Sequence, residues 1–202
     1  MTDAEKARLK ELYLPLADKF TLVDVPDMRF AMIDGRGAVD RAPLDHAVKW
    51  LYAALQPAKR IAKDRMGRDF VETPVEGLWW ADDMRDFAAG NREKMNWRMM
   101  VVTPDWLTPE IFDEGVTAAR ARLGDPPESL RVEAYAEGLC AQIMFIGPNA
   151  EEVPTIRRMH EEFLPANGLI ANGWHHEIYL NDARRVAPDK RKTVLRQPVR
   201  RA

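Results

Sequence analysis

Short apolar segments separated by turn residues predict most of the β-structure of this chain. The clearest alternation lies in Trp174–Leu180, where Ile178 and Leu180 alternate with Glu177 and Tyr179, as in a strand with one apolar face. The strands are expected at Phe20–Val25, Met28–Asp34, Val75–Trp80, Trp97–Val102, Leu130–Ala136, Leu139–Ile146, Trp174–Leu180 and Lys192–Val199.

Apolar residues at helical spacing predict the helices. Asp3 is placed to cap a helix over Ala4–Leu12, and Thr108-Pro109-Glu110 is a strong start for a helix that ends near Leu123. Pro43 begins another helix that Gln56-Pro57 ends, followed by an exposed charged connection over Lys59–Asp69. The helix after Gly147-Pro148 has an inner face made of Val153, Ile156, Met159, His160, Phe163 and Leu164.

The order strand–helix–strand–strand occurs twice along the chain. We therefore predict an α+β fold of two such units, at about 20–104 and about 130–199, joined by a bridging helix at about 108–124. Residues 1–19 are expected to form a helical extension. A pseudo-twofold relation between the units would place antiparallel sheets side by side, with the helices on one face and a central ligand groove on the other.

Composition excludes several classes of protein. The net charge of −2 gives no electrostatic signature for nucleic acid or an anionic membrane. Cys140 is the one cysteine, which excludes a disulfide within the chain and a zinc site built on several thiolates. The chain has no secretory signal and no apolar run of membrane-spanning length, so we expect a cytoplasmic protein.

Glu177 is the main candidate for chemistry. Alternation places it on one face of its strand with His175 and Tyr179, while His176 and Ile178 point the other way. A carboxylate enclosed by aromatic rings loses hydration, which raises its proton affinity and strengthens its attraction for a cation. The plainer alternative is a half-buried strand whose polar face meets water.

Aromatic residues are the candidate walls of a site around Glu177. Trp79 and Trp80 are adjacent in a strand, so one of them belongs to the core and the other is available to a ligand, with a slight preference for Trp80. Tyr135 shares its face with charged residues, which favours a groove over the core. The ligand-binding candidates are Trp79, Trp80, Trp97, Tyr135, Phe145 and His175, with Glu177 and Tyr179 as catalytic candidates.

Metal and cofactor motifs are absent from the sequence. The adjacent strand histidines His175 and His176 diverge and cannot chelate one ion together, and no zinc, phosphate-loop or dinucleotide motif occurs. We therefore expect neither a metal nor a cofactor. His160 is interpreted as a satisfied core histidine and Cys140 as an ordinary buried thiol.

The basic C-terminal segment is the strongest charge asymmetry of the chain. Such runs are usually solvated faces, although contact with an acidic protein partner is an open alternative. Its basic residues are Arg184, Arg185, Lys190, Arg191, Lys192, Arg196, Arg200 and Arg201.

Several longer motifs resemble the GyrI-like small-molecule-binding family over nearly the whole chain. The most specific is His175-His176-Glu177-Ile178-Tyr179-Leu180-Asn181-Asp182-Ala183-Arg184-Arg185, followed by Lys192–Val199. The others are Lys10–Tyr13, Leu22–Pro26, Ile33–Gly37, Val75–Trp80 and Gln142–Pro148. Phe145 and Asn149 depart from the family pattern, which commonly has histidine and tyrosine there.

The resemblance implies a GyrI-like domain over residues 20–202, with a ligand groove between the halves and a central glutamate. The leading hypothesis is a stand-alone binder of hydrophobic aromatic molecules, including cations. The alternative is a detoxifying hydrolase that opens cyclopropane-bearing DNA alkylators, with Glu177 as general acid or base. A third possibility is a gyrase-protecting factor that binds protein. About 20 residues precede the first strand, too few for the DNA-binding module that accompanies this domain in transcription regulators.

Overall fold

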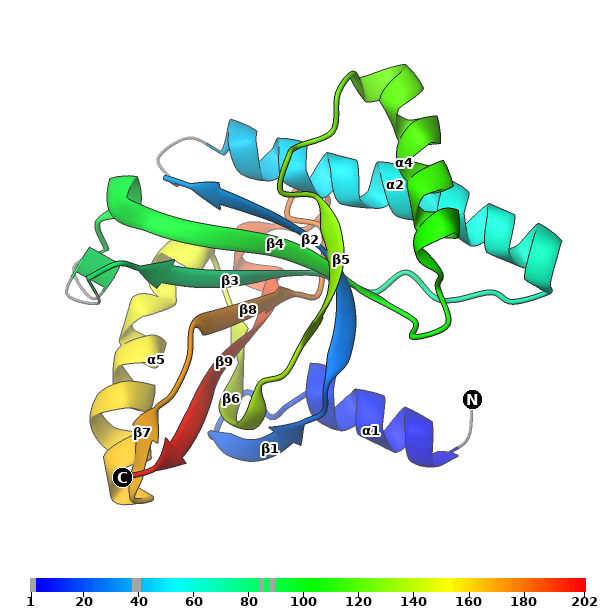
Figure 1. Cartoon of the computed structure of the whole chain (residues 1–202). Helices are drawn as coiled ribbons and strands as arrows, with labels where there is room; N and C mark the ends of the chain where they lie inside the picture. The colour runs from blue at the N-terminus through cyan, green and yellow to red at the C-terminus, as the bar shows by residue number, and fades with distance from the viewer. Residues whose placement is uncertain (1–2, 38–40, 84–85, 88–89) are drawn as a thin grey trace. The chain divides into compact units, whose positions relative to one another are not determined.

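The fold is α+β with antiparallel β-structure, as the sequence predicts (Figure 1). The computed structural model describes residues 3–37, 41–83, 86, 87 and 90–202. The chain divides into two compact units, which we name after a central residue of each. The Glu177 unit contains Met1–Asp27, Glu76–Leu78 and Ala136–Ala202, and the Trp97 unit contains Met28–Val75 and Trp79–Tyr135.

The Trp97 unit consists of helices packed on one face of a sheet. Its strands follow the order β3-β4-β2-β5, and their bounds are Val75–Ala81, Met95–Thr103, Met28–Arg36 and Arg131–Tyr135. The helices α2 (Ala42–Met66) and α4 (Pro109–Leu123) bury a core with alternate residues of β2 and β4. The Thr108 hydroxyl accepts a hydrogen bond from the Ile111 amide at 3.5 Å, which confirms the predicted helix start.

Helix α2 is longer than the sequence predicts. It continues through Pro57 to Met66, and Gly67, whose φ is 63°, forms a left-handed cap. The prediction of an exposed connection from Lys59 was wrong because Ala58 and Ala62 are fully buried. Gly115 of α4 lies so close that a Cβ there would come within 2.3 Å of the Ala54 carbonyl oxygen. The close helix contact therefore outweighs the cost of an internal proline.

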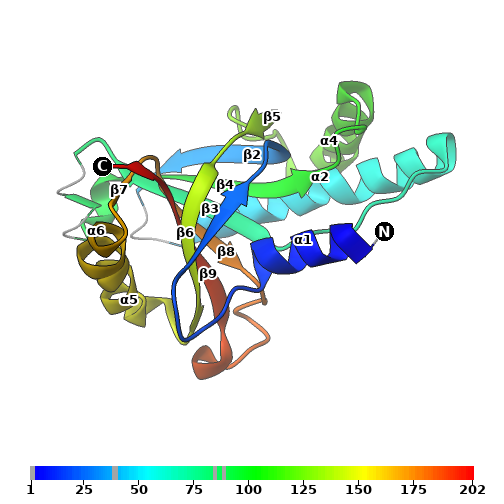
Figure 2. The same cartoon turned by 90° about the horizontal axis from the view of Figure 1, so that it is seen from below.

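The Glu177 unit has helical segments on both sides of its strands. Its strand order is β1-β6-β9-β8, β7 pairs with β9, and the Glu76–Leu78 part of β3 belongs to this unit. The bounds are β1 Thr21–Val25, β6 Gly138–Ile146, β7 Leu169–Ala171, β8 His175–Tyr179 and β9 Lys192–Arg201, with α1 at Asp3–Tyr13, α5 at Val153–Arg158 and α6 at Leu164–Ala166. Figure 2 shows α1 and α5–α6 on opposite sides of β6, β9 and β8.

The predicted strand–helix–strand–strand order is present in both halves of the sequence, but two strands pair in a different unit from the rest of their half. Strand β1 pairs with β6, and β5 pairs with β2. The first strand of each half of the sequence therefore joins the other unit. Strand β7 was not predicted, because three residues are too few to show a period.

The helix after the Gly147-Pro148 turn is interrupted. Residues Met159–Phe163 form a π-turn between α5 and α6. Val153, predicted on the inner face, is 55% exposed, whereas Met159 and Leu164 are buried. A π-turn inserts a residue into the helical period, so a stripe extrapolated at 3.6 residues per turn cannot hold on both sides of it.

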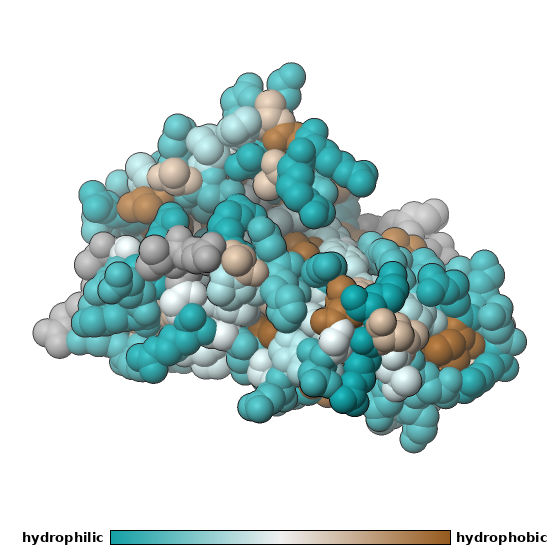
Figure 3. Space-filling view, turned by 90° about the horizontal axis from the view of Figure 1, so that it is seen from above, coloured by the Kyte–Doolittle hydropathy of each residue, from teal (hydrophilic) through white to brown (hydrophobic). Residues whose placement is uncertain are grey.

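The surface seen in Figure 3 is largely hydrophilic, and its apolar residues lie in small separate spots. In the described part of the chain, no helix is long and apolar enough to cross a membrane.

Candidate functional site

Glu177 lies in a group of polar side chains on one face of β8. The Tyr179 hydroxyl donates a hydrogen bond to Glu177 Oε2 at 2.8 Å. His175 Nε2 lies 3.6 Å from Glu177 Oε1. The Glu177 side chain is 14% exposed and that of His175 is 1% exposed. Strand alternation therefore brings together three of the predicted site residues, and the Glu177 carboxyl group lies largely out of water.

The helical segment α5–α6 covers this same face. Glu177 pairs with Leu195 of β9, and Leu195 pairs with Ile143 of β6, so the three side chains point to one side. Leu195 and Ile143 belong to a buried cluster with Met159 and Leu164 from the helical segment. The expectation that the glutamate lies on the face opposite the helices was wrong. Alternation fixes which residues share a face, but not which face a helix covers.

A second carboxyl group, Glu152, accompanies Glu177 and was missed in the sequence. Glu152 immediately precedes α5, is 3% exposed and accepts a hydrogen bond from Asn149 Nδ2 at 3.2 Å. Burial, followed by the nearby charge of Glu177, raises the Glu152 pKa to about 9. At neutral pH the site therefore holds a protonated carboxyl near Glu177. In sequence, Glu152 looks like an ordinary acidic residue at a helix start.

His160 lies at the π-turn on the same side of the unit. Its Nε2 atom is buried and has no hydrogen-bond partner among the described residues. Burial and the neighbouring His175 lower the His160 pKa, so the neutral ring is favoured. The interpretation as a satisfied core histidine was therefore wrong for this nitrogen.

The opposite face of β8 carries a buried network of charged groups. His176 Nδ1 lies 2.9 Å from Glu137 Oε1, and His176 Nε2 lies 3.0 Å from Glu76 Oε2. The side chains of His176, Glu137 and Glu76 are 0%, 2% and 1% exposed. The two carboxylates raise the His176 pKa to about 9 against the cost of burial, so the ring is cationic at neutral pH.

Arg196 completes this network and is not part of a solvated basic surface. Its Nη1 lies 3.1 Å from Glu137 Oε2, and its Nε donates to Gln142 Oε1 at 3.2 Å. His176 and Arg196 hold the Glu137 pKa down at about 2 despite burial. Arg184 and Arg185, by contrast, are more than four-fifths exposed beside Asp182. No feature of the local sequence separates Arg196 from its basic neighbours.

The tryptophans of the Trp97 unit have mainly packing roles. Trp97 is 3% exposed and donates from Nε1 to the Gly37 carbonyl at 2.8 Å. A Cβ on Gly35 would lie 2.1 Å from the Trp97 ring, so the absence of a side chain at Gly35 provides space for the indole. Of the two glycines in Gly35-Arg36-Gly37, Gly37 is the one with a positive φ. The candidate Trp97 is therefore a core residue. Trp79 packs partly against this core, so Trp80 points to the other face of β3.

Tyr135 ends β5 on the helix-free face of the Trp97 unit. Val132 of β5 packs against the helix-covered core, so Tyr135 shares the opposite face with Arg131 and Glu133, as predicted. Asp34 binds Arg98 through two hydrogen bonds of 2.6 and 3.0 Å on this face and also pairs with Arg131 at 3.1 Å. Tyr135 thus borders a network of surface ion pairs.

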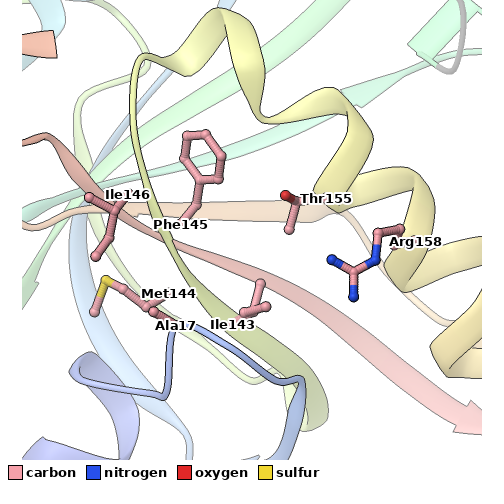
Figure 4. A pocket seen from close by; sticks show the side chains of 7 residues that line it. All are labelled: Ala17, Ile143, Met144, Phe145, Ile146, Thr155 and Arg158. Carbon is pink, nitrogen blue, oxygen red and sulfur yellow. The ribbon is translucent and has the colours of Figure 1, made fainter. Parts of the chain in front are cut away.

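Phe145 lines a pocket of about 210 Å³ beside β6 (Figure 4). The pocket is formed by Ile143–Ile146 together with Ala17, Thr155 and Arg158. Phe145 pairs with Thr193, which pairs with Tyr179, so the Phe145 side chain belongs to the Glu177 face of the sheet. Glu177 itself does not line this pocket.

The remaining chemical candidates are the cysteine and a metal site. Cys140 is fully buried, and burial raises the pKa of its thiol, as expected for an unreactive cysteine. Within the described residues, no three histidine, cysteine or acidic side chains are arranged to hold a metal ion.

A family model for the GyrI-like small molecule binding domain matches residues 18–200. An uncharacterised conserved protein from Listeria innocua is 35% identical, with a TM-score of 0.83 over 96% of this chain and 98% of that chain. A hydrolase from Listeria innocua is 34% identical, with a TM-score of 0.81 over the same shares. The EcmrR C-terminal domain, 10% identical with a TM-score of 0.59 over 91% of this chain and 98% of that chain, shares the fold. No curated protein matches the chain significantly.

Proposed function

Because the chain belongs to the GyrI-like small-molecule-binding family, we propose that it is a hydrolase of hydrophobic small molecules, with Glu177 at its centre. The observation that carries this proposal is the burial of Glu152 near Glu177, since burial and then the charge of Glu177 raise the Glu152 pKa to about 9. A carboxyl group that keeps its proton at neutral pH can supply a general acid beside a second carboxyl group. The Listeria hydrolase, at 34% identity over nearly the whole chain, supports the same class of activity.

The proposed substrates are electron-poor cyclopropanes of the kind that alkylate DNA. Glu177 takes a proton from water while the water oxygen bonds to a ring carbon. The ring C–C bond breaks, and its electron pair moves into the conjugated acceptor, which takes a proton from Glu152. Proton exchange with solvent then restores both carboxyl groups. Tyr179 orients Glu177 through its 2.8 Å hydrogen bond.

The test is turnover of a cyclopropane-bearing DNA alkylator by the wild type, Glu177→Gln and Glu161→Gln. Glu161 is a matched control, because it lies in the π-turn with a side chain that is 69% exposed. We expect ring-opened product from the wild type and Glu161→Gln, and a loss of about 10²–10⁴-fold in kcat for Glu177→Gln. Absence of product from the wild type would refute the hydrolase.

Binding without turnover is the second candidate, favoured by the largely buried Glu177 carboxylate. It predicts that Glu177→Gln weakens binding of a lipophilic aromatic cation and leaves binding of a neutral ligand of the same shape unchanged. Fluorescence titration with such a matched pair separates this role from catalysis.

A further inference from the structure

The buried network behind β8 joins four parts of the Glu177 unit around one ring. His176 comes from β8, Glu76 from β3, Glu137 from the turn before β6, and Arg196 from β9. Two carboxylates face a histidinium and a guanidinium, so the charges balance within the network. Each member makes at least one contact of 3.1 Å or less. Glu137 lies beside Nδ1 of His176 and Glu76 lies beside Nε2, so the ring is held from both of its nitrogens.

Helix α1 closes this network through its last turn. The Tyr13 hydroxyl donates to Glu76 Oε1 at 2.9 Å, and Arg196 Nη2 donates to the Leu12 carbonyl at 2.5 Å. Gln142 Nε2 donates to the Glu11 carbonyl at 2.8 Å. The bonds from Arg196 and Gln142 satisfy carbonyls that the end of a helix leaves without partners. Leu12 is 3% exposed and Leu9 is 41% exposed, so α1 is held mainly at its C-terminal end.

The position of the network links it to the proposed catalytic group. His176 precedes Glu177 in β8, and the two side chains leave opposite faces of one extended backbone. A rotation of the strand about its axis would move both side chains together. Since a misplacement of about 1 Å in a catalytic group costs about 10²-fold in rate, a rigid anchor on one face has consequences on the other.

We propose that His176, held by Glu76, Glu137, Arg196 and Tyr13 of α1, is a positioning residue that sets the orientation of Glu177. This inference rests on the proposed function of Glu177. It assigns a role to α1, which precedes the residues 18–200 matched by the family model. The polar network, and not apolar packing alone, then determines how well the site works.

The mildest test is Tyr13→Phe, which removes one hydroxyl and keeps the ring. Tyr52→Phe is the matched control, because it removes a similar 3.0 Å hydrogen bond, to the Thr73 carbonyl, in the Trp97 unit. Both variants are compared with the wild type at a temperature where all are folded by circular dichroism. For Tyr13→Phe we expect a loss of about tenfold in kcat with KM changed less than twofold, and for Tyr52→Phe no change in either.

A second readout needs no substrate. The carboxyl ¹³C resonance of Glu177, identified by its loss in Glu177→Gln, is expected to shift in Tyr13→Phe and to stay in place in Tyr52→Phe. If the wild type shows no turnover, the hydrolase fails, and the shift alone decides the positioning role. An unmoved resonance, or a kcat of Tyr13→Phe within twofold of the wild type, would overturn the inference and leave the network a purely structural one.

Discussion

The two faces of β8 differ in whether their buried carboxyl groups are paired with cations. Around His176, two carboxylates meet two cations, and every side chain is at most 3% exposed. Around Glu177, a second carboxyl group is buried with no arginine or lysine among its described contacts, and its pKa rises to about 9. A balanced network of this kind holds elements in place, whereas an unbalanced pair of acids keeps a proton ready at neutral pH.

The largest expected effect comes from unbalancing the His176 face. Glu137→Gln keeps the shape of the side chain but leaves His176 and Arg196 with one buried carboxylate between them. Removing one partner of a buried ion pair costs about 3–5 kcal/mol in the free energy of unfolding. Urea denaturation at pH 7 measures the loss, and Glu133→Gln, at an exposed carboxylate, is the control. A loss below about 1 kcal/mol would show that the network contributes little.

The same face predicts acid sensitivity. The Glu137 pKa falls from an ordinary value of 4.5 to about 2 in the folded chain. Its stabilising contribution is therefore complete above pH 4.5 and is lost as the pH falls toward 2. We expect the free energy of unfolding to fall over this range more steeply in the wild type than in Glu137→Gln. Parallel curves would contradict the assignment.

The Glu177 face predicts the opposite dependence on pH. In the folded chain Glu152 keeps a proton that the unfolded chain releases above about pH 4.5, so its contribution to stability falls as the pH rises toward 9. The slope is at most about 1.4 kcal/mol per pH unit. Glu152→Gln, which mimics the protonated acid, should flatten the dependence between pH 5 and 8 and stabilise the protein most at pH 8. Urea midpoints across this range measure it.

The smallest expected effect is at His160. Its buried Nε2 lacks a partner among the described residues, so His160→Phe removes an unsatisfied polar atom and keeps a ring. We expect a gain of about 1 kcal/mol in the free energy of unfolding, together with reduced turnover if the nitrogen serves the site. A clear loss of stability by thermal denaturation would show that the imidazole is satisfied in solution.

Local rules predicted the elements well where one strong signal dominates. The Thr108-Pro109 helix start, the Glu177 strand and its β9 partner are all confirmed. The same rules failed at Pro57, because packing of Ala58 against α4 outweighed the cost of the proline. They also failed at the π-turn, because an inserted residue breaks the period of 3.6 residues per turn. Of the candidate site, the shared face of His175, Glu177 and Tyr179 was predictable. Trp97 was misassigned, because its Gly35 contact lies 62 positions away in the chain.

The sequence by itself determined the family, the α+β elements and the division of β8 into a Glu177 face and a His176 face, because these depend on residues close together in the chain. Only the tertiary structure decided which face the helices cover, that Glu152 accompanies Glu177, and that Tyr13, Glu76, Glu137 and Arg196 surround His176. The physical reason is that ionisation and desolvation depend on neighbours in space. Those neighbours come from segments as far apart as residues 13 and 196, and no local sequence pattern shows that they come into contact.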